Sequence, residues 1–167
     1  MEKKKNDFIA QGSILAIASI LVRVMGMIYR IPMTAIIGDK GNGFYSYAYS
    51  VYTILLLLSS YSLPLAVSKM VSAKAQLGQW RNVKRVFICA IAFAIGIGTT
   101  FGLIVLIGAQ FFTRVFFHSE LAAIALRFMA PTILIMALLG VFRGFFQGLQ
   151  NTLPTAVSQI VEGLINA

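Results

Sequence analysis

The feature that most constrains this chain is a series of apolar stretches, several of which reach or approach the length needed to cross a membrane. The stretch 86–112 contains no charged residue, whereas about 20 apolar residues suffice to cross a bilayer as a helix. Charged residues make up only 11% of the sequence and hydrophobic residues 59%, against about 25% charged in a typical soluble domain. This pattern predicts an all-α membrane protein built as a polytopic helical bundle.

The apolar runs and the turn residues between them predict four complete transmembrane helices and the start of a fifth. Gly38 to Gly43 supply a turn after the first span, and Pro32 predicts a bend before it. The last run is too short to cross a bilayer at roughly 1.5 Å per residue. We therefore expect the chain to be the N-terminal part of a transporter lobe. The expected spans are 8–37, 44–67, 86–112, 121–147 and a truncated 154–167.

The positive charge follows the pattern of a membrane protein and argues against a nucleic-acid partner. The formal net charge is +9, but the basic residues lie at the ends of apolar runs or inside them. The basic segment 68–85 is expected to be the loop between two spans, formed by a short amphipathic segment at the level of the lipid headgroups that is broken at Gly78. Because Lys3, Lys4 and Lys5 fall on the same side as this loop, the positive-inside rule places the loop and the N-terminus in the cytoplasm.

Glycines recur at a spacing of four residues in the third and fourth spans. Gly98 and Gly102 form one such pair, and Gly140, Gly144 and Gly148 form a longer series. Small residues at this spacing let the backbones of membrane helices approach closely. The pattern predicts packing faces rather than chemistry.

Two arginines inside the first apolar run, Arg23 and Arg30, are the strongest candidates for function. Seven residues are close to two helical turns, so both side chains project from nearly the same face. Arg23 is expected near the membrane midplane, because it lies roughly 22 Å of helix beyond Phe8. An ionisable residue at that depth faces a cavity or a partner by default. The four complete spans offer no carboxylate at matching depth, so Glu162 is the one acid within this chain expected to approach.

Two explanations of the arginine pair stay open. The guanidinium groups suit phosphate or pyrophosphate oxygens and would bind an anionic substrate, or they would pair with acids on helices beyond this chain. Arg143 and Gln147 share a face at the cytoplasmic end of the fourth span. They are candidates for lining a cavity entrance, with interfacial anchoring as the alternative. Glu162 is a candidate for ion or proton coupling.

Residues for catalysis are not apparent in the sequence. There is no set of nucleophile, histidine and acid, no phosphate loop and no cluster of metal ligands. His118 and Glu120 share a loop without further ligands nearby, so they do not indicate a metal site. We expect a protein that is not an enzyme and uses no cofactor.

Three stretches carry a resemblance to a known family. They are RVMGMIYRIPMTAIIGDKGNGFYSYAY, SLPLAVSKMVS and FRGFFQGLQNTLPTAVSQIVE, which begin at Arg23, Ser62 and Phe142. In order and spacing they resemble the start of the polysaccharide biosynthesis and export family, in the group of stage V sporulation protein B and MurJ-type lipid II flippases. That group belongs to the multidrug/oligosaccharidyl-lipid/polysaccharide flippase superfamily.

The resemblance implies an approximately 14-helix transporter in a bacterial plasma membrane, with two lobes that alternate between inward-open and outward-open states. The implied substrate is an undecaprenyl-pyrophosphate-linked glycan precursor, either lipid II or a polysaccharide unit, which Arg23 and Arg30 would meet. Membrane lipids and the remaining helices of the transporter would be its other partners. Two positions depart from the family pattern: Ala35 stands where relatives often have a basic residue, and Gly163 where they often have glutamine.

Two rival functions belong to other classes. A cation antiporter of the multidrug and toxin extrusion type would call for buried acids in this lobe, where the chain offers arginines instead. A small membrane scaffold, complete at 167 residues, would pack through its glycine faces. The short fifth helix argues against the scaffold.

Overall fold

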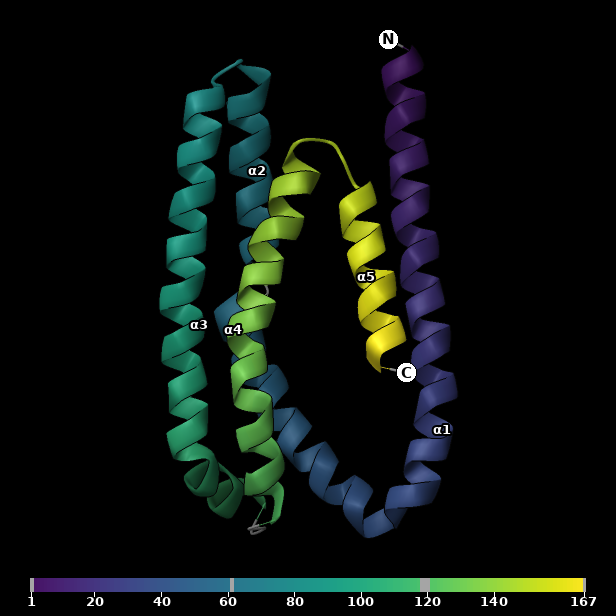
Figure 1. The fold of residues 1–167 in the computed structure, drawn as a ribbon, viewed down its shortest axis with the longest axis vertical. Coiled ribbons are helices and arrows are strands. Elements are labelled where there is room, and N and C mark those ends of the chain that lie inside the picture. Colours follow the sequence, from purple (N-terminus) through teal and green to yellow (C-terminus); the bar gives the residue numbers. More distant parts are fainter. Residues whose placement is uncertain (1, 61, 118–120, 167) are drawn as a thin grey trace.

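The computed structural model describes residues 2–60, 62–117 and 121–166, and every element in these ranges is an α-helix (Figure 1). His118 and Glu120 lie outside the described residues. Three stretches are long and apolar enough to cross a membrane: Ala16–Leu57, Trp80–Val115 and Ala122–Gly148. The expectation of an all-helical membrane protein is confirmed at this level. The helices are α1 (Glu2–Ser60), α2 (Leu63–Gln76), α3 (Trp80–Phe117), α4 (Leu121–Gly148) and α5 (Leu153–Asn166).

The first expected span and most of the second lie in α1, which bends at Gly38 into a V (Figure 1). The second span was expected to continue to residue 67, but α1 ends at Ser60 and α2 begins at Leu63. The apolar part of α1 has 42 residues, or about 63 Å of helix, roughly twice the 30 Å thickness of a hydrocarbon layer. Gly38 has φ 70° and ψ 174°, a conformation that is essentially restricted to glycine. Only Gly38 leaves helical geometry, so the expected turn from Gly38 to Gly43 is wrong in its extent. The helix continues through Pro32, so that proline does not break it, and a bend there stays a prediction.

The basic segment 68–85 is helical over most of its length rather than an irregular loop, and it is broken at Gly78 as expected. α2 ends at Gln76 and α3 begins at Trp80, with Gly78 at φ +68° in the turn between them. Pro64 lies in the first turn of α2, where its missing N–H costs nothing. The tip of this helical hairpin lies at the same end of the molecule as the start of α1 (Figure 1). Which end faces the cytoplasm stays a prediction.

Two apolar clusters place α4 at the centre of the fold. Both are rich in alanine and valine, whose small side chains let helices pack closely. The first cluster joins the second half of α1 to α3 and α4 through Ala48, Val51, Tyr52, Val105, Ala109, Ala123, Leu126, Ala130 and Ile133. The second joins α2, α3 and α4 through Leu63, Val67, Val71, Val83, Ala94, Ala137 and Val141.

Close packing at the glycine faces is confirmed. A Cβ atom at Gly98 would lie 2.9 Å from the Cα atom of Leu134 in α4. A Cβ atom at Gly148 would lie 2.7 Å from the carbonyl oxygen of Ser68 in α2. These distances are shorter than real Cβ contacts, so the glycines set how closely α3 and α2 approach α4.

The helices form two groups that meet along one seam. α5 packs mainly along the first half of α1 and touches α4 at few points (Figure 1). The second half of α1 packs with α3 and α4, and α2 packs on α3 and α4. The seam between the groups therefore runs between α5 and α4.

Candidate functional site

A polar pocket lies on this seam, where α1, α4 and α5 meet. Its volume is about 310 Å³. Two arginines and one glutamate give its lining a formal charge of +1. Such a concentration of charge is unusual in a chain with only 11% charged residues. The lining residues are Ser19, Val22, Arg23, Arg143, Gln159, Glu162 and Gly163; we call this space the seam pocket.

Helical spacing explains how each element reaches the seam pocket. On α5, Thr155, Ser158 and Glu162 follow one another at spacings of three and four residues, so they lie along one face. On α1, Ser19 and Arg23 are four residues apart and share a face in the same way. Each helix thus presents a short polar stripe toward the seam.

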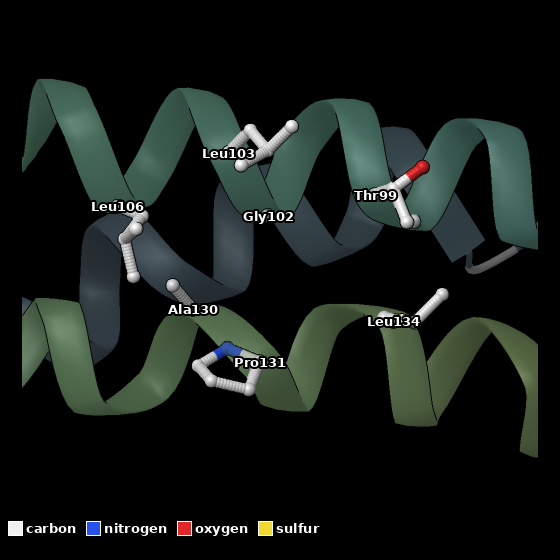
Figure 2. Close-up of a pocket in the computed structure, with 8 residues that line it drawn as sticks. Thr99, Gly102, Leu103, Leu106, Ala130, Pro131 and Leu134 are labelled. Carbon is white, nitrogen blue, oxygen red and sulfur yellow. The ribbon is translucent and has the colours of Figure 1, made fainter.

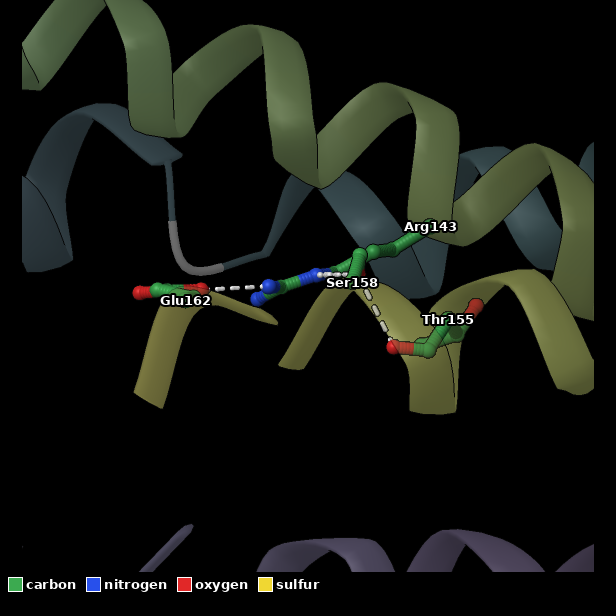
Figure 3. Close-up of polar contacts among 4 residues, drawn as sticks. All are labelled: Arg143, Thr155, Ser158 and Glu162. Atoms are coloured by element: carbon green, nitrogen blue, oxygen red, sulfur yellow. Dashed lines mark hydrogen bonds and ion pairs between the residues drawn. The ribbon is translucent and has the colours of Figure 1, made fainter. Parts of the chain in front are cut away.

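Arg143 crosses from α4 to α5 and is held there by two contacts (Figure 3). Its Nη2 atom lies 2.5 Å from a carboxylate oxygen of Glu162, and its Nε–H donates to Ser158 Oγ at 3.2 Å. Ser158 Oγ in turn donates to the carbonyl oxygen of Thr155 at 2.8 Å. The Arg143 and Glu162 side chains are 19% and 33% exposed, so the pair is only partly screened by solvent. Charge-assisted bonds of this kind fix the direction of the guanidinium.

Arg23 lines the same pocket but forms no ion pair with any residue that the structure describes. Glu162 instead neutralises Arg143. The net positive charge of the seam pocket is therefore that of Arg23, and an anion is the ligand that it suits.

The structure brings together only some of the residues singled out in the sequence. Arg23, Arg143 and Glu162 meet in the seam pocket, as Glu162 was expected to approach the first helix. Arg30 lies two turns further along α1 and Gln147 one turn further along α4, and neither lines this pocket. The sequence spacing had placed Arg23 and Arg30 on one face, but a shared face does not place them in one cavity.

Sequence reasoning missed Ser158 as a partner of Arg143. The available signal was its position four residues before Glu162, which places both on one face of α5. Gln159 belongs to the same wall, and its Oε1 atom is enclosed without a hydrogen-bond partner among the described residues. A ligand that also donates hydrogen bonds, such as a hydroxyl-bearing one, would satisfy this acceptor.

The structure also gives a physical reason for glycine at position 163. A Cβ atom there would lie 3.2 Å from Val22 Cγ2 on α1. Gly163 is buried at this contact, so the absence of a side chain lets α5 approach α1 closely. Glycine at this position is thus part of the packing beside the seam pocket.

A second pocket, of about 250 Å³, lies between α3 and α4 and differs in chemistry (Figure 2). Leu103, Leu106, Pro131 and Leu134 are among its lining residues, which include no charged side chain. Its one hydroxyl, on Thr99, donates to carbonyl oxygens of its own helix. This groove therefore has room for an apolar group but presents no charged side chain and no free hydroxyl among its lining residues.

Comparison with known proteins gives a consistent result over nearly the whole chain. A family model described as "Polysaccharide biosynthesis protein" matches residues 8–167. Three proteins of Bacillus subtilis (strain 168) are similar: lipid II flippase MurJ (27% identity), stage V sporulation protein B (27%) and the uncharacterized membrane protein YabM (28%). These alignments cover 91%, 96% and 95% of this chain but only 29%, 31% and 29% of the relatives. No solved structure matches the chain.

Proposed function

The chain belongs to the polysaccharide biosynthesis protein family, and on that premise we propose that it forms part of a flippase for a lipid-linked glycan precursor. The proposed substrate is an undecaprenyl-pyrophosphate-linked glycan, either lipid II or a polysaccharide unit, moved across a bacterial plasma membrane by alternating access. Similarity to a protein named lipid II flippase supports the class of substrate. No chemical bond of the substrate changes in this process.

The observation that carries the proposal is the unneutralised guanidinium of Arg23 in the seam pocket. A lone cation within a membrane-spanning stretch is costly, and an anionic ligand offsets that cost. Pyrophosphate oxygens match the donors of a guanidinium in charge and geometry. In the proposed complex Arg23 binds the diphosphate while the polyprenyl tail stays in the bilayer.

We propose separate roles for Arg30, Arg143, Gln147 and Glu162, according to where each lies relative to Arg23. Arg30 lies two turns away on the same helix and is proposed as a second contact when the substrate moves along α1. Arg143 and Gln147 line the route at the end of α4. Glu162 remains the candidate for proton or ion coupling, a role that requires its release from Arg143.

Pairing of Glu162 also bears on the rival cation antiporter. The carboxylate that would attract a cation is already bound to Arg143. The seam pocket keeps a formal charge of +1, which repels a cationic substrate. The geometry therefore favours an anion.

The test is translocation of fluorescent lipid II by the intact protein in proteoliposomes. We expect Arg23→Gln to slow translocation by at least about 10-fold, the size of a lost hydrogen bond to a charged group. Arg127→Gln is the matched control, because Arg127 is an exposed arginine on α4 that does not line the seam pocket. Equal rates for the Arg23→Gln variant and the wild type would overturn the proposal.

A further inference from the structure

We propose that Glu162 is an internal counter-anion that competes with the substrate diphosphate for Arg143. A diphosphate then engages both arginines of the seam pocket only after it displaces this carboxylate. The inference rests on the proposed function, because it takes a diphosphate as the incoming anion. It adds a residue that sets the affinity of the site and links binding to a change between helices.

The first argument is electrostatic. Glu162 lines the same pocket as Arg23 and Arg143, so an anion that enters meets a negative charge as well as two positive ones. Without the carboxylate charge the lining would carry +2 instead of +1. A carboxylate and a phosphate use the same donors of a guanidinium. The two anions therefore compete for Arg143.

The second argument comes from how α5 is attached. Within the part of the chain that the structure describes, both side-chain hydrogen bonds between α4 and α5 involve Arg143, one to Ser158 and one to Glu162. α5 also packs closely on α1, where Gly163 faces Val22 beside the same pocket. Loss of the Arg143–Glu162 pair would weaken the link to α4 and leave the contact with α1 in place.

These two arguments together couple binding to movement. The diphosphate replaces Glu162 on Arg143, and the freed carboxylate no longer holds α5 against α4. The first half of α1 joins its second half at the bend at Gly38, and α5 joins α4 through residues 149–152, so movement of α5 together with this half of α1 would take place about these two connections. Glu162 acts here as a positioning residue, since its effect is exerted through Arg143.

The experiment measures binding of farnesyl diphosphate, a short polyprenyl diphosphate, to the intact protein in nanodiscs. Glu162→Gln removes the competing charge at nearly constant shape. We expect it to bind the probe at least about 10-fold more tightly than the wild type, the factor expected for a hydrogen bond to a charged group. Glu162→Asp keeps the charge and should bind like the wild type. Unchanged or weaker binding by Glu162→Gln would overturn the inference.

A separate variant distinguishes this inference from the proposed function. Loss of farnesyl diphosphate binding in Arg23→Gln supports the anion site, whatever Glu162→Gln does. If Arg23→Gln binds the probe like the wild type, the proposed function fails. If Arg23→Gln loses binding and Glu162→Gln gains none, only the role of Glu162 fails.

A distance measurement tests the movement in a protein that keeps Glu162. Spin labels would be placed at Ile135→Cys on α4 and Leu164→Cys on α5, both exposed positions outside the seam pocket, with the exposed Cys89 replaced by serine. Addition of farnesyl diphosphate should lengthen the distance between the labels. In the Glu162→Gln background the longer distance should be present before the probe is added. A distance that does not respond to the probe would overturn the coupling.

Discussion

The two pockets of this molecule have similar volumes, about 310 Å³ at the seam and about 250 Å³ between α3 and α4, yet they differ in what they offer a ligand. The seam pocket combines three charged side chains from three helices. The α3–α4 groove is lined by apolar side chains, glycines and one threonine whose hydroxyl is already used. The difference teaches that space alone does not identify a site in a membrane bundle. The proposal for the seam pocket rests on both its space and the charge of Arg23 within it.

The two pockets also differ in what the glycines beside them contact: backbone atoms at one pocket and a side chain at the other. Gly98 and Gly102 beside the apolar groove fit against the backbone of α4, where nothing can yield. Gly163 beside the seam pocket faces the side chain of Val22, which can shift by a few tenths of an ångström. The α3–α4 contact is therefore expected to be rigid, and the α1–α5 contact more adaptable.

Reversal of the charge at Arg23 should have the largest effect, because it removes the positive charge that distinguishes the seam pocket from the α3–α4 groove. Arg23→Glu changes the formal charge of the seam pocket from +1 to −1, and like charges placed together cost several kcal/mol, or about 100-fold or more in rate. We expect translocation of lipid II in proteoliposomes to fall by that factor, with partial activity in Arg23→Lys. Full activity of Arg23→Glu would contradict an anion-binding role.

Gly98 offers the next largest effect, on stability rather than transport. Gly98→Ala places a methyl group against the backbone of Leu134, and overpacking of this kind costs about 1–3 kcal/mol. Gly96→Ala is the matched control, because a Cβ atom there meets nothing within 4 Å. Unfolding in mixed detergent should show the first variant destabilised and the second not. Equal stabilities would show that the α3–α4 contact is looser than described.

Gly163 should show a smaller effect that its neighbour relieves. Gly163→Ala crowds Val22 and is expected to cost about 1 kcal/mol, at the low end for overpacking. Val22→Ala should recover much of that loss in the double variant, which a double-mutant cycle on unfolding free energies would detect. Strictly additive effects would mean that α5 does not meet α1 at this point.

The smallest effects compare one hydroxyl from each pocket. Ser158→Ala removes the partner of Arg143 Nε and should cost about 0.5–1.5 kcal/mol of stability, as for an ordinary hydrogen bond. Thr99→Val removes a hydroxyl that bonds only within its own helix and should change stability by less than about 0.5 kcal/mol. Thermal unfolding of both variants is the measurement. A larger loss for Thr99→Val would reverse the ranking of the two pockets.

Much of the helical layout could be predicted because its signals are local. The uncharged stretch 86–112 lies inside α3, and the glycine spacings gave the packing faces of α3 and α4. The errors concern where helices stop. Gly38 bends α1 at a single residue, and α2 and α3 together cover most of the segment 68–85, whose charges suggested a loop. Charged residues indicate which part of the chain is exposed to water, whereas a helix ends where the backbone leaves helical φ and ψ angles. A polar segment can therefore remain helical.

By itself the sequence determined the class of the protein and most of its helices, and it made Arg23 a candidate, because hydrophobicity, spacing and the cost of a charge within an apolar run are properties of short segments. Only the tertiary structure decided that Arg143 holds Glu162, that Arg23 shares their pocket and that Arg30 does not. Those facts depend on the bend at Gly38 and on which faces of α1, α4 and α5 meet. Contacts between residues far apart in the chain are set by packing, which no short segment encodes.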